Sequence, residues 1–373
     1  MRITEPYIIF PRKLKSGRVV YYYQFRDEEG KRSAAYSTGT DKLSQAKRIC
    51  QKMYNQGQFV KHNGLTFKSF ANGFFDDDSD WCKWRKVNDS TLAASTIHSY
   101  RQILQNRIMP YFENIELKKI NTDIVKKWIV WLSEKASAKS TNNAQSVLNI
   151  ILKSAKEKKL IKELPTAGLS FRKIKKKERQ LLSLTELNQI YHSPLWYSQS
   201  VKNAFLLCCL TGMRIGEVTG LQTVDISENY INVQHSLHPD FGLGQTKTRV
   251  CRYVPIPSEL NLKSLCGEVW AFPRTDKKEP VNEKTVYSNF TKICDSLNIE
   301  RKERGITVHS LRNFFISYAR GNTQGINIEA KIKAVVGHAD ETQTDWYTYW
   351  TPDMFTEIYK LQSQLYKEIT KGA

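Results

Sequence analysis

The stretch Thr211-Gly212-Met213-Arg214-Ile215-Gly216-Glu217 interrupts a long apolar region in the second half of the chain. Residues 204–210 before it have the apolar pattern of a buried helix, and a Thr-Gly pair is a typical end for such a helix. The pattern resumes at Ile215, with Glu217 in the first turn, where a carboxylate is favoured. Arg214 is therefore expected at a break between two helices. Its planar guanidinium could bind two phosphate oxygens at once, although an arginine at a helix start is more often structural or solvated.

A second basic pair lies in His309-Ser310-Leu311-Arg312, at the start of a helical pattern that runs through residues 311–319. A spacing of three residues places His309 and Arg312 on one face of a helix. Both side chains could therefore reach a common phosphate.

Lys247 is a third candidate. It lies in Gly244-Gln245-Thr246-Lys247-Thr248-Arg249, between strand candidates at residues 230–233 and 253–256, and is expected at the tip of a hairpin. An ammonium there could protonate a departing sugar oxygen. Taken alone, a lysine on a hairpin tip says nothing about function.

Gly337-His338 precedes Tyr347 by nine positions, counted from the histidine. In one continuous helix this separation would place the two side chains on opposite faces. Convergence requires a break, which polar residues 340–344 could provide. Tyr347 offers a hydroxyl that can form a covalent phosphotyrosyl link. The neighbouring residues Trp346, Tyr349 and Trp350 leave open the alternative that this aromatic cluster only packs.

Together, these side chains provide what metal-free cleavage of a phosphodiester requires. They include cations for a phosphate, groups that move protons, and a hydroxyl that attacks phosphorus. The sequence offers no convincing carboxylate cluster for a metal, so neither a metal nor another cofactor is expected.

In order and local context, these residues resemble those of the tyrosine recombinases, specifically the phage-type and mobile-element integrases. The resemblance covers nearly the whole chain. It departs from the usual pattern at Asn313 and Tyr349, where many relatives carry histidine. The resemblance implies that the catalytic residues are Arg214, Lys247, His309, Arg312, His338 and the nucleophile Tyr347, with Glu217 as a supporting acid.

The resemblance also implies a mechanism. Tyr347 would attack the scissile phosphate, giving a 3′-phosphotyrosine and a free 5′-hydroxyl. Arg214, Arg312 and His338 would stabilise the charge that grows on the phosphoryl oxygens. Lys247 would act as general acid, and His309 would assist phosphate binding or proton transfer.

Charge supports a nucleic-acid partner independently of the motifs. The 373 residues include 57 Lys and Arg against 37 Asp and Glu, a net charge of +20. A cationic surface gains affinity for DNA by releasing counterions from the phosphate backbone. An anionic membrane would also attract a basic protein, but the charge is spread through folded segments rather than gathered on one amphipathic stretch. No segment is long and apolar enough to span a membrane, and no secretory signal is visible, so we expect a cytoplasmic protein.

The expected fold is multidomain and mainly α, with small β elements. Residues 1–60 are expected to form a small sheet, with strands at 19–25 and 31–37 joined by a turn at residues 27–30, and one helix from residue 43. The resemblance implies that this unit binds arm-site DNA. Residues 65–165 show three or four amphipathic helices, one of which is expected to end at Pro110, and are predicted to form a helical bundle. The resemblance implies that this bundle binds the core site. Residues 166–180 contain a dense basic run and are the linker candidate. Residues 181–373 form the catalytic α+β domain with a C-terminal tail helix.

The tail carries an apolar stripe that includes Phe355, Ile358, Leu361, Leu365 and Ile369. It could pack on its own core or, as the resemblance implies, dock on a neighbouring subunit in a homotetramer on double-stranded DNA. Accessory DNA-bending proteins are further candidate partners. Seven irregularly spaced cysteines favour buried free thiols over disulfides or a zinc site.

Two other functions remain open at this point. A type IB topoisomerase uses similar chemistry but relaxes DNA, and a catalytically idle relative would only bind it. The three-part organisation favours a recombinase, and the full set of six catalytic residues favours an active enzyme.

Overall fold

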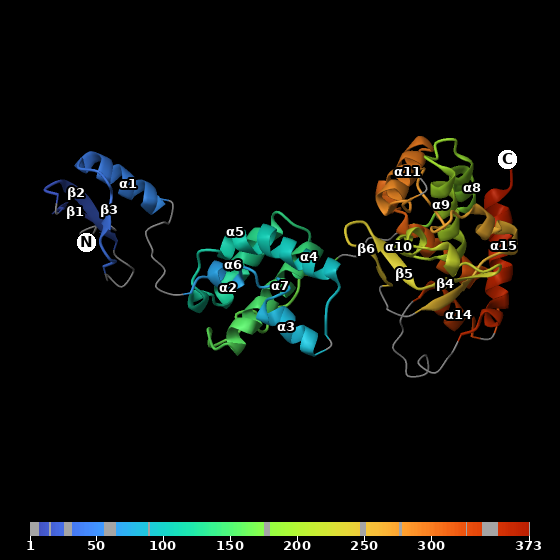
Figure 1. The fold of residues 1–373 in the computed structure, drawn as a ribbon, viewed down its shortest axis with the longest axis horizontal. Helices are drawn as coiled ribbons and strands as arrows, with labels where there is room; N and C mark the ends of the chain where they lie inside the picture. Colours follow the sequence, from blue (N-terminus) through green and yellow to red (C-terminus); the bar gives the residue numbers. More distant parts are fainter. Residues whose placement is uncertain are drawn as a thin grey trace. The chain divides into compact units, whose positions relative to one another are not determined.

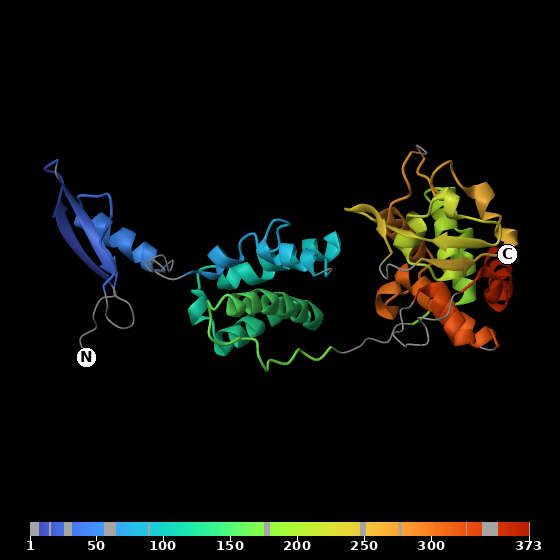
Figure 2. The ribbon, with the colours of Figure 1, turned by 60° about the horizontal axis from the view of Figure 1, so that its bottom comes forward.

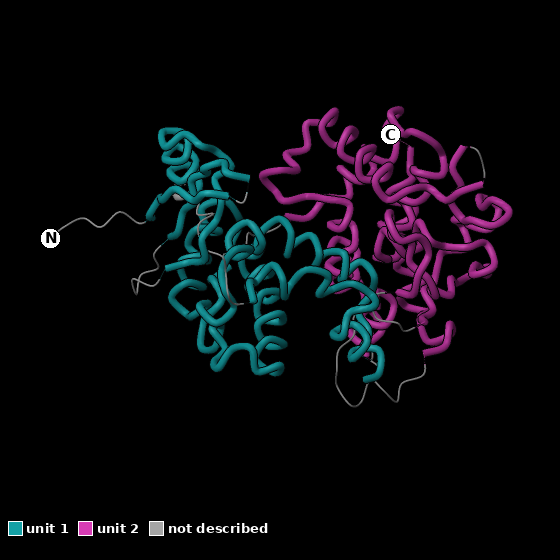
Figure 3. Tube along the Cα trace, turned by 60° about the vertical axis from the view of Figure 1, so that its left-hand side comes forward, with its two compact units in different colours: residues 1–174 teal, residues 175–373 magenta. Residues whose placement is uncertain are grey.

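The structure is a computed structural model of the chain. It describes residues 7–14, 16–25, 32–55, 65–88, 90–174, 180–246, 251–275, 278–325, 327–337 and 350–372, and of residues 54 and 55 only the backbone. The chain folds into two compact units, Met1–Ile174 and Lys175–Ala373 (Figure 3).

The first unit begins with a sheet and one helix. Three antiparallel strands in the order β1-β2-β3 are followed by α1, which lies against one face of the sheet (Figures 1 and 2). A small core of Tyr23, Phe25 and Cys50 joins them. The elements are β1 (Tyr7–Lys13), β2 (Val19–Phe25), β3 (Tyr36–Ser37) and α1 (Leu43–Asn55).

The predicted strand at residues 19–25 and the helix from residue 43 are confirmed. The main partner of β2 is not the segment that follows it. Instead β1, which precedes β2, pairs along its whole length, from Tyr7 opposite Phe25 to Lys13 opposite Val19. The following segment contributes only β3, whose two residues pair with Tyr22 and Tyr23. The predicted turn at residues 27–30 lies outside the described residues.

The rest of the first unit is helical, as predicted. Its core includes Phe67, Phe112, Trp128 and Leu148, each less than 2% exposed. Polar caps set the starts of its two longest helices, because Asn121 and Ser137 accept backbone hydrogen bonds from the first turns of α6 and α7. The elements are α2 (Phe67–Ala71), α3 (Asp80–Val87), α4 (Ala94–Ile103), η1 (Leu104–Ile108), α5 (Met109–Phe112), η2 (Leu117–Lys119), α6 (Thr122–Ser133) and α7 (Ala138–Glu157).

Pro110 does not end the helix, contrary to the simplest interpretation of its position. The chain widens into the π-helical turn η1, and the N–H of Met109 donates to the carbonyl of Leu104, five residues back. Proline has no N–H to contribute and would clash with a regular α-helical turn before it. The wider turn accommodates the ring, and α5 continues to Phe112.

Residues 166–174 lie along α7 although their composition is typical of a linker. The Thr166 hydroxyl donates to Asn149 Oδ1 at 2.6 Å, and the backbone N–H of Arg172 donates to Asn142 Oδ1 at 2.9 Å. Both asparagines belong to α7. Residues 175–179, most of the basic run, lie outside the described residues.

The second unit combines helices with two short antiparallel ribbons, β4–β7 and β5–β6. Its core is the largest of the chain and takes side chains from α8 through to α15. The helices are α8 (Leu184–His192), α9 (Gln199–Thr211), α10 (Ile215–Thr219), α11 (Glu283–Ser296), α12 (Arg301–Arg304), α13 (His309–Asn322), α14 (Ile328–Val336) and α15 (Thr356–Thr370). The strands are β4 (Tyr230–Val233), β5 (His235–His238), β6 (Gly242–Gln245) and β7 (Arg252–Pro255), and short turns are η3 (Thr223–Asp225), η4 (Ser258–Leu260), η5 (Leu262–Leu265) and η7 (Pro352–Phe355).

The hairpin tip of the β5–β6 ribbon lies earlier in the chain than predicted. His235 pairs with Gln245 and His238 with Gly242, so the tip falls at residues 239–241. Gly244 and Gln245, expected in the tip, belong to β6. The chain then passes from β6 to β7 through a segment that includes Lys247, which itself lies outside the described residues.

The tail helix α15 packs on its own unit, beside α8 and α9 (Figure 1). Ile358, Leu365 and Ile369 are fully buried. The Asn188 side chain of α8 also donates to the carbonyls of Ile369 and Lys371, at 3.0 and 2.9 Å. Of the two alternatives for the apolar stripe, the structure therefore shows packing within the chain.

All seven cysteines are free thiols, and five of them are buried. The prediction of buried free thiols is confirmed for these five, whereas Cys251 is exposed and Cys266 is partly buried. None of the helices that the structure describes has the length and apolarity needed to cross a membrane.

Candidate active site

The corner between α9 and α10 is built around Gly212. Its φ of +65° ends α9 in the left-handed conformation, which glycine adopts without strain. A Cβ at this position would lie 2.7 Å from Phe315 Cδ1 and 3.1 Å from Val336 Cγ1. The missing side chain thus allows α13 and α14 to approach the end of α9. The predicted break between two helices is confirmed, with Arg214 as the N-cap residue of α10.

Two further glycines bring α10 against the β5 backbone. A Cβ at Gly216 would lie 2.9 Å from the carbonyl oxygen of Leu237, and one at Gly220 would lie 2.6 Å from the Leu237 nitrogen. Real Cβ atoms do not approach backbone so closely. The second glycine of the opening motif therefore fixes the helix that supports Arg214 to the β5–β6 ribbon.

Glu217 is the anionic centre of the corner. Its side chain is fully buried, and Oε1 accepts from Arg214 Nη1 at 2.8 Å. Its Oε2 accepts from the backbone N–H of Arg214 at 2.9 Å. Burial raises the pKa of the Glu217 carboxyl, but the charge and hydrogen bonds of Arg252, together with those of Arg214, outweigh it and bring the pKa below its ordinary value. Glu217 is therefore ionised at neutral pH and holds Arg214 in one orientation.

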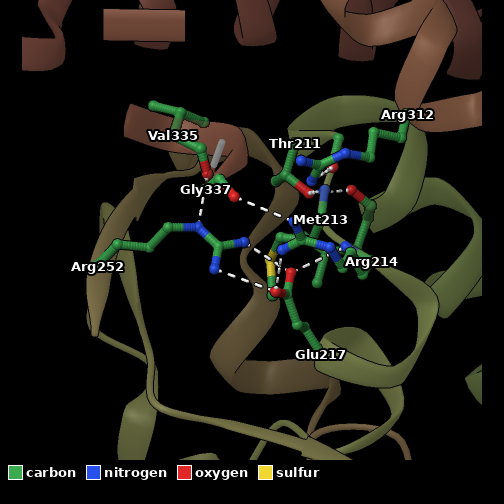
Figure 4. Close-up of polar contacts among 10 residues, drawn as sticks. Thr211, Met213, Arg214, Glu217, Arg252, Arg312, Val335 and Gly337 are labelled. Carbon is green, nitrogen blue, oxygen red and sulfur yellow. Dashed lines mark hydrogen bonds and ion pairs between the residues drawn. The ribbon is translucent and has the colours of Figure 1, made fainter. Parts of the chain in front are cut away.

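Arg252, at the start of β7, is the second cation on Glu217 (Figure 4). Its Nη2 donates to Glu217 Oε2 at 2.6 Å and its Nη1 to Oε1 at 3.2 Å. Its Nε donates to the carbonyl of Val335 in α14, at 2.8 Å. Only 8% of its side chain is exposed. This guanidinium is thus bound on two sides by groups of the protein.

Arg312 is the third cation, and it is satisfied differently. It is 3% exposed, and its Nη1 donates to the carbonyl of Gly212 at 2.8 Å. Its Nη2 is buried and has no hydrogen-bond partner among the described residues. Burial, and next the charge of Arg214, lower the pKa of Arg312 to about 10, so the side chain remains protonated at neutral pH.

The charges in this cluster do not balance. The guanidiniums of Arg214, Arg252 and Arg312 contribute +3 and Glu217 contributes −1, which leaves +2 on the four side chains. A buried cation without a counter-ion costs several kcal/mol. An anion with several oxygens, such as a phosphodiester, would supply both the missing charge and the missing acceptors.

The other residues expected in the site are only partly visible. His309 is the first residue of α13 and is exposed, and Arg312 follows three positions later on the same helix. Lys247, His338 and Tyr347 lie outside the described residues. Gly337, which directly precedes His338, is described, and its carbonyl accepts from Arg214 Nη2 at 3.0 Å.

Arg252 is the residue of this cluster that the sequence analysis missed. A signal was present, because side chains alternate between the two faces of a strand and Arg252 shares a face with Val254, which is fully buried. An arginine on a buried face needs a partner. Its partners, Glu217 and Val335, lie 35 and 83 residues away in the chain and could not be identified from local patterns.

Within the described part of the chain, no three His, Cys, Asp or Glu side chains are grouped as ligands of a metal ion would be. The only carboxylate hydrogen-bonded within the corner that the structure describes is Glu217, and both of its oxygens accept from arginines.

Comparison with known families agrees with this geometry. Residues 180–353, which contain the whole cluster, match the phage integrase family. Residues 80–133 match the N-terminal SAM-like domain of phage integrases. The chain belongs to the phage integrase family of tyrosine recombinases. Membership makes it a site-specific recombinase, an enzyme that cuts and rejoins DNA.

Individual relatives cover most of the integrase chain at low identity. The integrase of Staphylococcus phage L54a is 23% identical over 331 residues, which cover 77% of this chain and 92% of the relative. The tyrosine recombinase XerD of Halalkalibacterium halodurans is 23% identical over 279 residues, covering 72% and 91%.

Solved structures share the fold of the integrase. A lambda integrase dimer bound to a COC′ core site aligns with a TM-score of 0.58 at 19% identity, over 94% of this chain and 98% of that one. The Tn1549 transposon integrase in complex with transposon right end DNA gives a TM-score of 0.58 at 18% identity, over 75% and 98%. The predicted multidomain, mainly α fold with small sheets is confirmed.

Proposed function

We propose that this recombinase cuts each DNA strand by attack of Tyr347 on the scissile phosphate, which Arg214 and Arg312 bind. The attack joins the phenolic oxygen to phosphorus as a 3′-phosphotyrosine and releases the 5′-hydroxyl. The covalent link conserves the bond energy, so the 5′-hydroxyl of a partner strand can reverse the step without ATP.

The observation that carries this proposal is the buried, partly unsatisfied Arg312. Its Nη2 is aimed at no acceptor within the described residues, although the side chain is 3% exposed. A phosphoryl oxygen is a suitable acceptor, and its charge grows in the transition state. A donor that is already fixed and desolvated stabilises that charge without reorganising.

The remaining catalytic roles come from the family motif. Lys247 would protonate the departing 5′-oxygen, and His338 would join Arg214 in binding a phosphoryl oxygen. His309, at the exposed start of α13, would assist phosphate binding or proton transfer. Glu217 would hold Arg214 and would not bind DNA, because both of its oxygens already accept from arginines and a carboxylate repels phosphate.

A selection for covalent adducts tests this proposal without knowledge of the target site. The full-length protein is incubated with nicked duplexes of randomised sequence, and SDS-resistant complexes are isolated and sequenced. A nick beside the scissile phosphate lets the leaving strand diffuse away and traps the adduct. We expect enrichment of a defined sequence and a phosphotyrosyl peptide that contains Tyr347.

The matched control is Tyr349→Phe, two residues from the proposed nucleophile. We expect Tyr347→Phe to abolish the adduct while binding of the selected duplex persists, and Tyr349→Phe to keep it. The reverse result would move the nucleophile to Tyr349. Arg214→Lys should not cleave DNA although it keeps the positive charge, since a point charge replaces a planar fork.

Two outcomes would favour the alternative functions. Tight binding of DNA without any adduct would indicate a catalytically idle relative. Relaxation of a supercoiled plasmid that lacks the selected site would indicate a topoisomerase-like activity.

We further propose that the N-terminal sheet binds arm-site DNA through the face turned away from α1. On that face Arg12 lies over the ring of Tyr22 at 5.2 Å, and Phe10 pairs with Tyr22 across the strands. Removing residues 1–60 should reduce recombination between two sites more than cleavage of a single nicked site. Equal loss of both activities would contradict a separate arm-binding role.

The helical bundle of residues 65–165 would bind the core site. The active form would be a homotetramer on two DNA sites. It would act in the cytoplasm, together with accessory DNA-bending proteins. A lambda integrase tetramer bound to a Holliday junction shares the fold at a TM-score of 0.56. Because α15 already packs on its own unit, the subunit contact is expected to use a different surface from the α15 stripe. Mass photometry of the protein on a two-site DNA would measure the stoichiometry.

A further inference from the structure

Arg252 joins three segments that carry the proposed catalytic residues. Through the carboxylate of Glu217 it is tied to α10, whose N-cap residue is Arg214. Through the carbonyl of Val335 it is tied to the last turn of α14. Arg252 is also the first residue of β7, where it pairs with Val233 of β4. In the chain, Arg252 follows Lys247 by five residues.

The end of α14 is held from two sides. Arg252 Nε binds the carbonyl of Val335 at 2.8 Å, and Arg214 Nη2 binds the carbonyl of Gly337 at 3.0 Å. A Cβ on Gly337 would lie 2.9 Å from the Arg252 Cζ, so only glycine allows this guanidinium to lie against the helix end. Cations at a helix C-terminus interact favourably with its carbonyls. His338 follows directly from this clamped turn.

Arg252 is not placed to bind a phosphate itself. Its Nε, Nη1 and Nη2 all donate to protein oxygens. This distinguishes it from Arg312, whose Nη2 has no acceptor among the described residues. Its effect on the reaction must therefore pass through the groups that it holds.

We propose that Arg252 is a positioning residue for strand cleavage: it fixes the Glu217 carboxylate, which orients Arg214, and the end of α14, which His338 follows in the chain. This inference rests on the catalytic roles proposed above. A displacement of about 1 Å in a catalytic group can cost roughly 100-fold in rate.

Arg252→Lys is the first test, with Arg304→Lys as the matched control. Arg304 also binds a carboxylate with both terminal nitrogens, that of Glu186, and donates to a backbone carbonyl, that of Leu181, at 2.7 Å. Lysine keeps the charge at both positions but cannot reproduce the fork. We expect both variants to lose stability, with the smaller loss at Arg304, whose pair with Glu186 is more exposed. Only Arg252→Lys should lose about 100-fold in the rate of adduct formation on the selected duplex, per folded molecule, with DNA affinity within about threefold of wild type.

The pH dependence provides a readout that a purely structural role would not move. In Arg252→Gln, Glu217 loses the cation that does most to keep it ionised. Its carboxyl should then take up a proton at a higher pH than in the wild type, and Arg214 would lose its anchor. We expect cleavage by Arg252→Gln to fall as the pH is lowered over a range in which wild-type cleavage is still constant.

The outcomes separate this inference from the proposed function. If the wild type forms the Tyr347 adduct and Arg252→Lys forms it as fast per folded molecule, the positioning role is wrong and the catalytic roles stand. Equal rate losses in Arg252→Lys and Arg304→Lys would also overturn it. A wild type that forms no adduct on any duplex would overturn the catalytic roles and this inference together.

Discussion

Arg312 in the second unit and Lys127 in the helical bundle both carry a positive charge, but Arg312 is 3% exposed whereas the Lys127 side chain is 68% exposed. Lys127 has an ordinary surface partner, Asp123, at 2.9 Å one turn away on α6. Arg312 has one carbonyl and a nitrogen without an acceptor among the described residues. The same charge is thus solvated in one region and withheld from solvent in the other.

The difference separates affinity from chemistry. An exposed pair contributes about 0–1 kcal/mol, and its charge remains available to any polyanion by counterion release. A buried guanidinium interacts far more strongly with an anion that reaches it, because the surroundings screen the charge less. We therefore expect substitutions at the α9–α10 corner to change the rate of cleavage, and substitutions on the bundle to change only the affinity for DNA.

Arg312→Met should show the largest effect. Removal of the donor is expected to reduce adduct formation by about 1,000-fold, because it is aimed at charge that develops in the transition state. The free energy of unfolding should stay unchanged or rise by up to about 2 kcal/mol, because an uncompensated buried charge is removed. Urea unfolding and adduct yield on the selected duplex measure the two quantities. A loss of stability together with near-normal cleavage would break the comparison.

Glu217→Gln tests the anion that holds the corner together. Loss of this buried carboxylate leaves Arg214 and Arg252 facing each other, and we expect a loss of about 3–5 kcal/mol at neutral pH. Glu186→Gln is the control, since Glu186 pairs with Arg304 but its side chain is 20% exposed. We expect Glu186→Gln to lose less unfolding free energy than Glu217→Gln.

The acid dependence of Glu217→Gln follows from the lowered pKa of Glu217. Because the folded pKa lies below the ordinary value of 4.5, ionised Glu217 stabilises the fold above that pH. The contribution is lost as the pH falls through the lowered value. The difference in unfolding free energy between wild type and Glu217→Gln should therefore narrow from pH 7 towards pH 3. A constant difference over this range would mean that folding does not shift the pKa of Glu217, and a difference that widens towards low pH would mean that burial raises it.

Gly212→Ala should have a somewhat smaller effect, about 2–4 kcal/mol of unfolding free energy. The new alanine would have to adopt a positive φ, and its Cβ would lie 2.7 Å from the buried ring of Phe315. Gly242→Ala is the matched control, because Gly242 has a φ of +73° but nothing within 4 Å of its Cβ position. It should cost only about 1–2 kcal/mol. Similar losses in both variants would show that the close packing at the corner matters little.

The α9–α10 corner was predictable because its determinants are local. An apolar run, a Thr-Gly stop and a carboxylate in the next turn are all read within residues 204–217. Glu217 could be named as a supporting acid from the family motif; the structure shows its buried ion pair with Arg214, and its supporting role in catalysis stays a prediction. What could not be predicted depends on distant partners.

Three cases show the limit. Arg252 looked like the start of an ordinary strand, because its partners lie 35 and 83 residues away. The N-terminal sheet pairs β2 with the preceding strand, although the turn signal after β2 favoured the following one. Pro110 was expected to stop a helix, but a π-turn accommodates it, and local propensity does not anticipate that turn. In each case tertiary contacts decided between alternatives that the local sequence leaves nearly equal.

Lys126→Gln and Lys127→Gln are the mildest tests of the comparison, and they sharpen its other half. Both lysines are exposed on α6, so each substitution should change the unfolding free energy by no more than about 0.5 kcal/mol. If Lys126 meets a phosphate, its loss should weaken DNA binding about threefold at physiological salt. It should also lower the slope of log affinity against log salt concentration by about 0.9. Lys127→Gln should have less effect on both, because Asp123 already offsets its charge and repels phosphate. In neither variant should the cleavage rate of the saturated complex change. A tenfold fall in that rate for Lys126→Gln would mean that surface charge on the bundle reaches the chemistry, and the separation between affinity and catalysis would not hold.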